Sequence, residues 1–112
     1  MKVAIPVTQG ILHPHFGHSE QFAIFQVNPE TKQVQTSQML PPPPHEPGVL
    51  PNWLADQGVT VVLAGGLGKK AETLLASRGI EIVTGVPEQS PEMALQQYLD
   101  ERLTTEGNPC TH

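Results

Sequence analysis

Histidines in one short stretch are the first residues of this chain whose type and spacing could do chemistry. Three of the five histidines, His13, His15 and His18, lie close together, and His45 follows further along. Neutral imidazole binds zinc, iron, copper or nickel through one ring nitrogen, so several imidazoles in a short loop can meet at one ion or cluster. Their spacing matches no zinc-finger pattern. Surface histidines that cap turns or titrate without a role remain the alternative interpretation.

A second candidate group is Cys110 with His112, two positions apart. A thiolate and an imidazole at this spacing could chelate a soft metal or an iron–sulfur unit. The segment from Arg102 to Cys110 can extend about 25 Å, more than the radius of gyration of about 13 Å for a domain of this size, so it could fold back onto the histidines. The alternative is a terminus with an incidental free thiol.

A glycine-rich turn is the third candidate. A β-branched apolar run over residues 59–64 leads into three glycines and two lysines: Gly65, Gly66, Gly68, Lys69 and Lys70. Glycine permits positive φ and close approach of a ligand, and the free N–H groups of the helix that follows could face an anion. Such an anion could be a phosphate or a negatively charged metal–sulfur cluster. A tight strand-to-helix turn with no ligand is the alternative, and a nucleoside triphosphatase is not expected because Lys70 stands where a phosphate loop has a hydroxyl.

Ordinary enzyme classes find little support. No serine lies in a Gly-x-Ser-x-Gly elbow, and the two aspartates, Asp56 and Asp100, fall on expected helices rather than at strand ends. We therefore expect a protein that is not an enzyme. One alternative is a metal-dependent hydrolase in which a histidine-bound ion activates water and Glu46 is the general base. Another is a protein-interaction module that docks a partner on Pro41–Pro44 as an extended strip.

Length and charge narrow the class of protein. The 112 residues suffice for one domain, expected over 1–103, with a flexible tail over 104–112. A net charge of −5 argues against nucleic-acid and membrane-surface binding. Pro6 interrupts the first apolar stretch, so no signal peptide is expected, and one cysteine fits the reducing cytoplasm.

Apolar periodicity predicts the elements that must position these candidates. Strands are expected over 2–7, 21–27, 33–39, 59–64 and 80–83, and helices over 50–57, from 69 to Gly79, and over 91–103. The order β-β-β-α-β-α-β-α predicts an α/β fold with a mixed sheet and flanking helices. Pro6 should mark the end of the first strand or an edge position.

The weak apolar signal of residues 33–39 predicts a sheet edge, which would permit pairing into a homodimer. Ligands of open α/β sheets favour the carboxyl ends of the strands. The expected strands 2–7 and 59–64 should both end at one edge, which would gather the histidine loop and the glycine turn.

Four segments carry a resemblance to a known family: His15-Phe16-Gly17, Pro47–Pro51, Val61–Gly68 and Cys110-Thr111-His112. The chain resembles the dinitrogenase iron–molybdenum cofactor biosynthesis proteins, which occur as free-standing domains and within nitrogenase accessory factors. The resemblance covers nearly the whole chain. It implies a ribonuclease-H-like fold and a carrier or chaperone of iron–sulfur or molybdenum-containing clusters rather than a catalyst.

The resemblance also implies roles for individual residues. His15 becomes the leading cluster ligand, the glycines of the turn become the floor of the site, and the family's Cys-x-His ending falls on Cys110 and His112. This chain has His18 where many members carry Arg, and Thr111 where Asp is common. Implied partners are the proteins that donate the cluster and accept it, and the resemblance supports cluster binding more than a link to nitrogenase.

Overall fold

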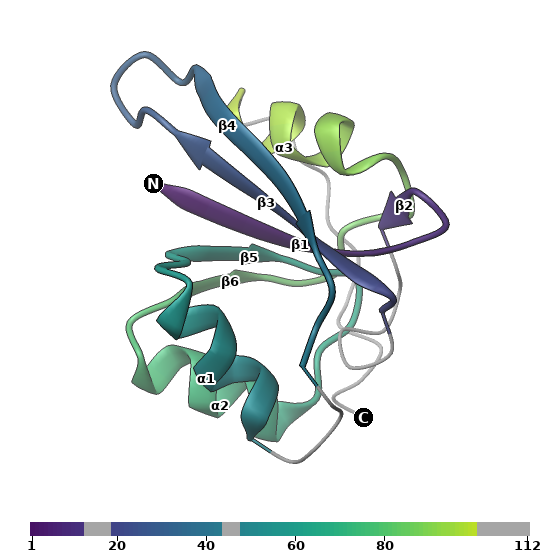
Figure 1. The fold of residues 1–112 in the computed structure, drawn as a ribbon, viewed down its shortest axis with the longest axis vertical. Coiled ribbons are helices and arrows are strands. Elements are labelled where there is room, and N and C mark those ends of the chain that lie inside the picture. Colours follow the sequence, from purple (N-terminus) through teal and green to yellow (C-terminus); the bar gives the residue numbers. More distant parts are fainter. Residues whose placement is uncertain (13–18, 44–47, 101–112) are drawn as a thin grey trace.

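Helices pack on both faces of a mixed sheet in the computed structural model, which describes residues 1–12, 19–43 and 48–100 (Figure 1). The strands are β1 (Lys2–Thr8), β2 (Ile11–Leu12), β3 (Gln21–Val27), β4 (Val34–Leu40), β5 (Val61–Leu63) and β6 (Glu81–Val83). The helices are α1 (Val49–Asp56), α2 (Lys69–Ser77) and α3 (Pro91–Leu99). The predicted mixed α/β architecture is confirmed, and the order of elements in the described residues differs from the prediction by the added strand β2.

The strands follow the order β4-β3-β1-β5-β6, and β2 pairs with β1 off this path. β3 runs antiparallel to β1 and β4, whereas β5 runs parallel to β1 and β6. The antiparallel β3–β4 hairpin and the edge position of β4 are both as predicted. β1 and β5 therefore lie inside the sheet, and their carboxyl ends point the same way.

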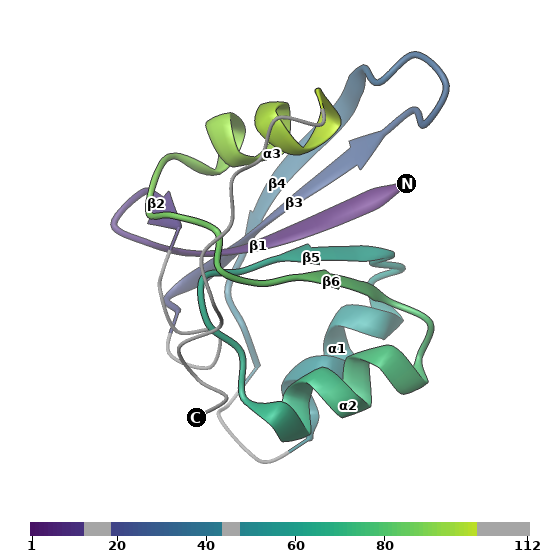
Figure 2. The same ribbon diagram turned by 180° about the vertical axis from the view of Figure 1, so that it is seen from behind.

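Two apolar cores lie on opposite faces of the sheet because the side chains of β1 alternate between them. Val3 and Ile5 pack on one face with Leu95 of α3. Ala4 packs on the other face with Leu54 of α1, in the core that also holds buried residues of α2. Figures 1 and 2 show the same division, with α3 on one side of the sheet and α1 and α2 on the other. Burial of both faces explains why the interior strands read as continuous apolar runs.

β1 continues past Pro6 to Thr8, so the predicted strand end is wrong, whereas Pro6 does lie where the strand has no neighbour for its missing N–H, as at a sheet edge. The carbonyl of Val7 accepts a hydrogen bond from the Glu20 N–H on the β3 side, so the backbone of Pro6 faces the opposite side. On that side, pairing with β5 stops at Ala4 and pairing with β2 starts at Val7. Pro6 occupies the gap between these two partners and removes no ladder hydrogen bond.

Local signals set the helix ends. The Ser90 hydroxyl accepts a hydrogen bond from the Met93 N–H at 3.2 Å and caps α3, whose first residue is Pro91. Gly58 and Gly79 follow α1 and α2 with φ of 84° and 76°, the left-handed conformation that ends many helices. No helix within the described ranges combines the length and the apolar content that crossing a membrane requires.

Candidate functional site

The segment that carries the clustered histidines is held at both ends by one residue of β1. Leu12 is the strand partner of Val7 on one side, and the Glu20 N–H donates to the Val7 carbonyl on the other side at 3.1 Å. Leu12 is 1 % exposed, and its N–H donates to the Gln89 carbonyl at 2.8 Å. His13, His15 and His18 themselves lie outside the described residues. Their segment nevertheless leaves and returns at the carboxyl end of β1, as predicted.

Sequence analysis missed β2, the strand that fixes one of these ends. Gln9 and Gly10 join β1 to β2 with φ of 54° and 79°, the two positive values of a two-residue hairpin turn. The Gln9 N–H donates to the Glu20 carboxylate at 3.2 Å, which ties the turn to the start of β3. A glycine in a two-residue turn between Thr8 and Ile11 was the available signal, although Gln-Gly is weaker than Asn-Gly.

The glycine turn begins where β2 replaces β5 as the neighbour of β1. Pairing between β5 and β1 covers Val61 and Val62, and β2 occupies the next positions along the same side of β1. The chain beyond β5 then turns away and bonds instead to the segment after β6, where the Gly85 N–H donates to the Gly65 carbonyl at 2.8 Å. The turn therefore lies at the same end of the sheet as the histidine segment.

The three glycines of the turn do not adopt the positive φ that glycine permits. None of Gly65, Gly66 and Gly68 has a positive φ, whereas Gly85 opposite has a φ of 74°. Gly65 and Gly66 are buried, and the Gly65 carbonyl accepts the hydrogen bond from the Gly85 N–H. Gly68 is exposed, and a Cβ added there would meet nothing within 4 Å.

Gly68 is also the N-cap of α2, with φ of −63° and ψ of 148° and without a side-chain capping hydrogen bond. Ser, Thr, Asp or Asn is preferred at such a position because the side chain satisfies an N–H of the first turn. The glycine leaves these N–H groups without a cap from this residue, and Lys69 and Lys70 are exposed beside them. Neither steric nor conformational need in the described fold requires glycine at position 68.

The proline-rich segment starts at the same end of the sheet. Leu40, the last residue of β4, pairs with Phe22, and Phe22 pairs with Pro6. The chain therefore leaves β4 near the carboxyl end of β1 before it enters α1. His45 and Glu46 belong to this segment and lie outside the described residues.

Residues 1–12, 19–43 and 48–100 contain no group of three His, Cys, Asp or Glu side chains able to hold a metal ion. The six predicted ligands all lie outside these ranges: His13, His15, His18, His45, Cys110 and His112. The structure thus brings together the ends of two histidine-bearing segments and the glycine turn with Lys69, and leaves the ligands themselves as predictions.

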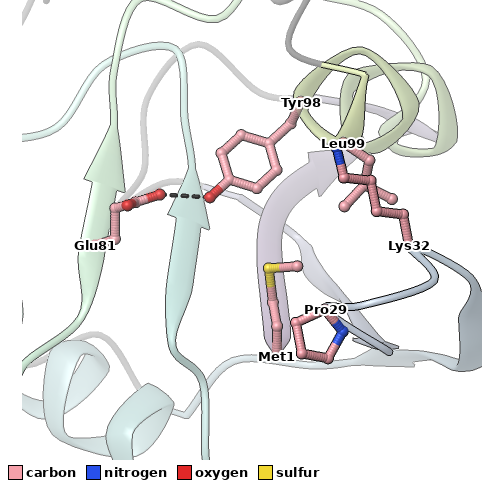
Figure 3. A pocket seen from close by; sticks show the side chains of 6 residues that line it. All are labelled: Met1, Pro29, Lys32, Glu81, Tyr98 and Leu99. Atoms are coloured by element: carbon pink, nitrogen blue, oxygen red, sulfur yellow. Dashed lines mark hydrogen bonds between the residues drawn. The ribbon is translucent and has the colours of Figure 1, made fainter.

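A pocket of about 360 Å³ lies at the opposite end of the sheet (Figure 3). It is lined by Met1, Pro29, Lys32, Glu81, Tyr98 and Leu99. The Tyr98 hydroxyl donates to the Glu81 carboxylate. Partial burial, together with the hydrogen bond and the charge of Glu81, raises the pKa of Tyr98 to about 12. None of the predicted site residues lines this pocket, and no sequence signal pairs α3 with β6 across 17 positions.

Known proteins resemble this chain over almost its full length. A sequence model of the family described as dinitrogenase iron-molybdenum cofactor matches residues 1–101. The crystal structure of PH0822 is 30% identical, with a TM-score of 0.86 and 95% of each chain covered. The apo orange protein of Desulfovibrio gigas is 24% identical, with a TM-score of 0.72, 96% of this chain and 94% of that chain covered.

A protein of Methanocaldococcus jannaschii shares the fold at 15% identity, with a TM-score of 0.75 and 97% of each chain covered. No curated protein matches the chain significantly. The two structures below 25% identity establish a common fold with this chain. The family match supplies the link to a cofactor.

Proposed function

Because the chain belongs to the dinitrogenase iron–molybdenum cofactor family, we propose that it binds and carries an iron–sulfur or molybdenum-containing cluster without catalysing a reaction. The family is named for the iron–molybdenum cofactor of dinitrogenase, which supports a metal–sulfur cluster as the cargo. Carriage in the cytoplasm between a donor and an acceptor protein follows as part of the same proposal.

The observation that carries this proposal is the attachment of residues 13–18 at Val7. Leu12 and Glu20 both contact this residue, so the histidine segment starts and ends where the glycine turn also lies. We assign His15 as the first ligand of the cluster, assisted by His13, His18 or His45. Cys110 and His112 would complete the ligand set from the tail, residues 104–112, that follows the proposed domain over 1–103.

The start of α2 would stabilise the negative charge of the cluster. A cluster rich in sulfide carries negative charge from its own sulfur atoms, and the amino end of a helix carries partial positive charge on its unpaired N–H groups. Gly65 and Gly66 form the buried floor, Gly68 permits close approach to the N–H groups of α2, and Lys69 adds a full positive charge.

The strand order supports the finer fold assignment that the resemblance implies. We propose that this arrangement is ribonuclease-H-like: β3 alone runs antiparallel to the other long strands, with β4 beyond it, and β5 and β6 run parallel to β1 on its other side. In this arrangement the carboxyl ends of β1 and β5 share one end of the sheet, where ligands of open α/β sheets bind.

The experiment that tests the proposal is metal and sulfide analysis with absorption spectroscopy on protein purified without oxygen. The measurement is repeated after incubation with iron, sulfide and molybdate. We expect visible charge-transfer bands and stoichiometric iron or molybdenum. The variant His15→Ala should retain at least about tenfold less metal, with an unchanged circular dichroism spectrum. A colourless protein that holds only a loosely bound divalent ion would contradict cluster carriage.

A matched pair of lysine variants tests whether cluster retention depends on the positive charge of Lys69. Lys69 lies beside the glycine turn, and Lys32 lines the pocket at the other end of the sheet. We expect Lys69→Gln to lower cluster retention and to make it less sensitive to salt, while Lys32→Gln leaves both unchanged. Equal losses in the two variants would show a general effect of net charge and would remove Lys69 from the site.

A further inference from the structure

The pocket at the amino end of β1 lies apart from the elements that frame the candidate cluster site. Its walls come from the start of β1, the turn between β3 and β4, the start of β6 and the end of α3 (Figure 3). Its volume of about 360 Å³ falls in the range of pockets that hold small organic molecules. The proposed cluster site contains none of its lining residues, so binding here does not depend on cluster carriage.

Two opposite charges line this pocket from different elements. Figure 3 shows Glu81 of β6 on one side and Lys32, from the turn before β4, on the other. Both residues are exposed, and in the described structure they form no ion pair with each other. The other lining side chains are largely apolar: Met1, Pro29, Tyr98 and Leu99. The pocket therefore offers a negative and a positive group across apolar walls.

A hydrogen bond holds the carboxylate of Glu81 in place. The Tyr98 hydroxyl donates to Oε2 of this carboxylate. Partial burial, with this hydrogen bond and the charge of Glu81, raises the pKa of Tyr98 to about 12, so the phenol stays a neutral donor. Among the described residues no donor bonds to the other oxygen, Oε1. That oxygen can accept a hydrogen bond from a ligand, and an ammonium group would also balance its charge.

The backbone at Lys32 also indicates a use for its side chain. Lys32 has a φ of 60°, and Gln9 is the only other described residue besides glycine with a positive φ. Glycine or asparagine adopts this conformation at lower cost than lysine does. The Lys32 N–H donates to the Asn28 carbonyl at 2.8 Å, which fixes the point from which the side chain extends to the pocket. Such strain is often kept where a side chain has a function, and the ammonium is what lysine adds here.

We propose that this pocket binds a small zwitterion whose ammonium and carboxylate groups are joined by an apolar body, as in an apolar amino acid or a dipeptide. The ligand ammonium donates to the Glu81 carboxylate, and the Lys32 ammonium donates to the ligand carboxylate. The apolar body packs against Met1, Pro29 and Leu99.

The two charges exclude the simpler classes of ligand. Glu81 would repel an anion that has no ammonium group, and Lys32 would repel a cation that has no carboxylate. A neutral apolar molecule would cover both charged groups without giving either of them a partner. Only a ligand with both charges satisfies both sides of the pocket.

Isothermal titration calorimetry of the full chain tests the proposal. L-Leucine and L-leucyl-L-leucine are the two probes, and they distinguish an amino acid from a dipeptide. For each probe, the amide lacks the carboxylate and the deamino analogue lacks the ammonium. We expect at least one probe to bind with a Kd of about 1 mM or lower, and its two single-charge analogues to bind about fivefold or more weakly. Binding of neither probe, or equal binding of a single-charge analogue, would overturn the proposal.

Charge variants locate the binding. Lys32→Gln and Glu81→Gln should each weaken binding of the zwitterion about fivefold or more. Lys70→Gln and Glu88→Gln make the same charge changes on exposed residues outside the pocket and should leave binding unchanged. Equal effects of all four variants would overturn the proposal.

A double-mutant comparison separates recognition by Glu81 from a structural role. In Glu81→Gln the deamino analogue should bind as well as the zwitterion, because the carboxylate that distinguishes them is gone. A merely structural role would weaken both ligands and keep their ratio. An unchanged ratio would therefore remove Glu81 from the site and overturn the proposed pairing of charges.

Discussion

The two ends of the sheet are held together by different kinds of bond. At the amino end of β1, side chains and the terminal ammonium form hydrogen bonds to neighbouring elements. The Met1 ammonium donates to the Val27 carbonyl at 3.0 Å, and the Lys2 ammonium donates to the Gln57 carbonyl at 2.6 Å. The Thr60 hydroxyl bonds to both the N–H and the C=O of Lys2. This end joins the first strand to the turn after α1 and to the end of β3.

At the carboxyl end, backbone groups make most of the described contacts between loops. The Leu12 N–H bonds to the Gln89 carbonyl, and the Gly85 N–H bonds to the Gly65 carbonyl. Within the described residues, the amino end therefore adds side-chain bonds to its backbone bonds, whereas the loops at the carboxyl end are joined mainly through backbone groups. Three pairs of variants and the single variant Tyr98→Phe test this difference between the two ends.

The largest effect is expected at Leu12, the buried anchor of the histidine segment. Leu12→Ala should lower the free energy of unfolding by about 2–5 kcal/mol because it empties a filled position in the core. Its neighbour Ile11 is 47% exposed, so Ile11→Ala should change stability by less than about 1 kcal/mol. Urea denaturation followed by the fluorescence of Trp53, the single tryptophan, measures both. Equal losses would show that β2 is not an anchor.

Lys2 and Lys69 compare the same side chain at the two ends. Lys2→Met removes the partly buried hydrogen bond to the Gln57 carbonyl and should cost about 1–2 kcal/mol of unfolding free energy. Lys69→Met alters an exposed residue at the start of α2 and should change stability by less than about 0.5 kcal/mol. The same urea titration measures both variants. A larger loss of stability in Lys69→Met than in Lys2→Met would contradict the difference between the two ends.

Tyr98 gives the amino end a dependence on pH. Its pKa is about 12 in the folded chain and 10.0 ordinarily, so the folded state favours the neutral phenol. The resulting stabilisation is complete below pH 10.0 and is lost as the pH rises towards about 12. Tyr98→Phe should therefore lose less stability than wild type over this interval. Ultraviolet absorbance reports the phenolate of this single tyrosine directly, and ionisation at the ordinary pKa would contradict the bond to Glu81.

The smallest effect on stability is expected at Gly68. Gly68→Ala introduces a Cβ into open space at a φ that alanine adopts, but alanine is a poorer N-cap than glycine, so the two effects oppose each other and stability should change by less than about 1 kcal/mol. Gly79→Ala, at a φ of 76°, should be destabilised by about 1 kcal/mol. Metal analysis should show less cluster in Gly68→Ala alone. Full retention in this variant would remove the close approach at α2 from the proposed site.

Much of the fold could be predicted because its local signals agree with its packing. Ser90 with Pro91 specifies the start of α3, and the apolar run before Gly65 specifies an interior strand. β2 could not be predicted, because two residues are too few for periodicity and its stability comes from pairing with β1. The end of β1 was mispredicted at Pro6. Whether a strand tolerates proline depends on whether a neighbouring strand needs its N–H, and this is set by the pairing of the whole sheet.

The candidate site was predicted less completely than the fold. The sequence located the glycine turn and Lys69, and the strand order explains why the turn lies at the same end of the sheet as the residues that flank the histidine segment. It could not predict that Gly68 is open to solvent while Gly65 is buried, because that difference depends on the path of the chain after β6. The bond between Tyr98 and Glu81 also arises only when α3 packs across the sheet.

The two attachments at Val7 also bear on how this segment can change in evolution or by design. The ends of residues 13–18 are already brought together by strand pairing, so the entropy of closing the loop is set by the fold. For a loop between fixed points, doubling the length adds only about 0.6 kcal/mol to that cost. Insertions and exchanges between Leu12 and Glu20 can therefore change the length and the side chains of this segment while the sheet that supports it stays the same.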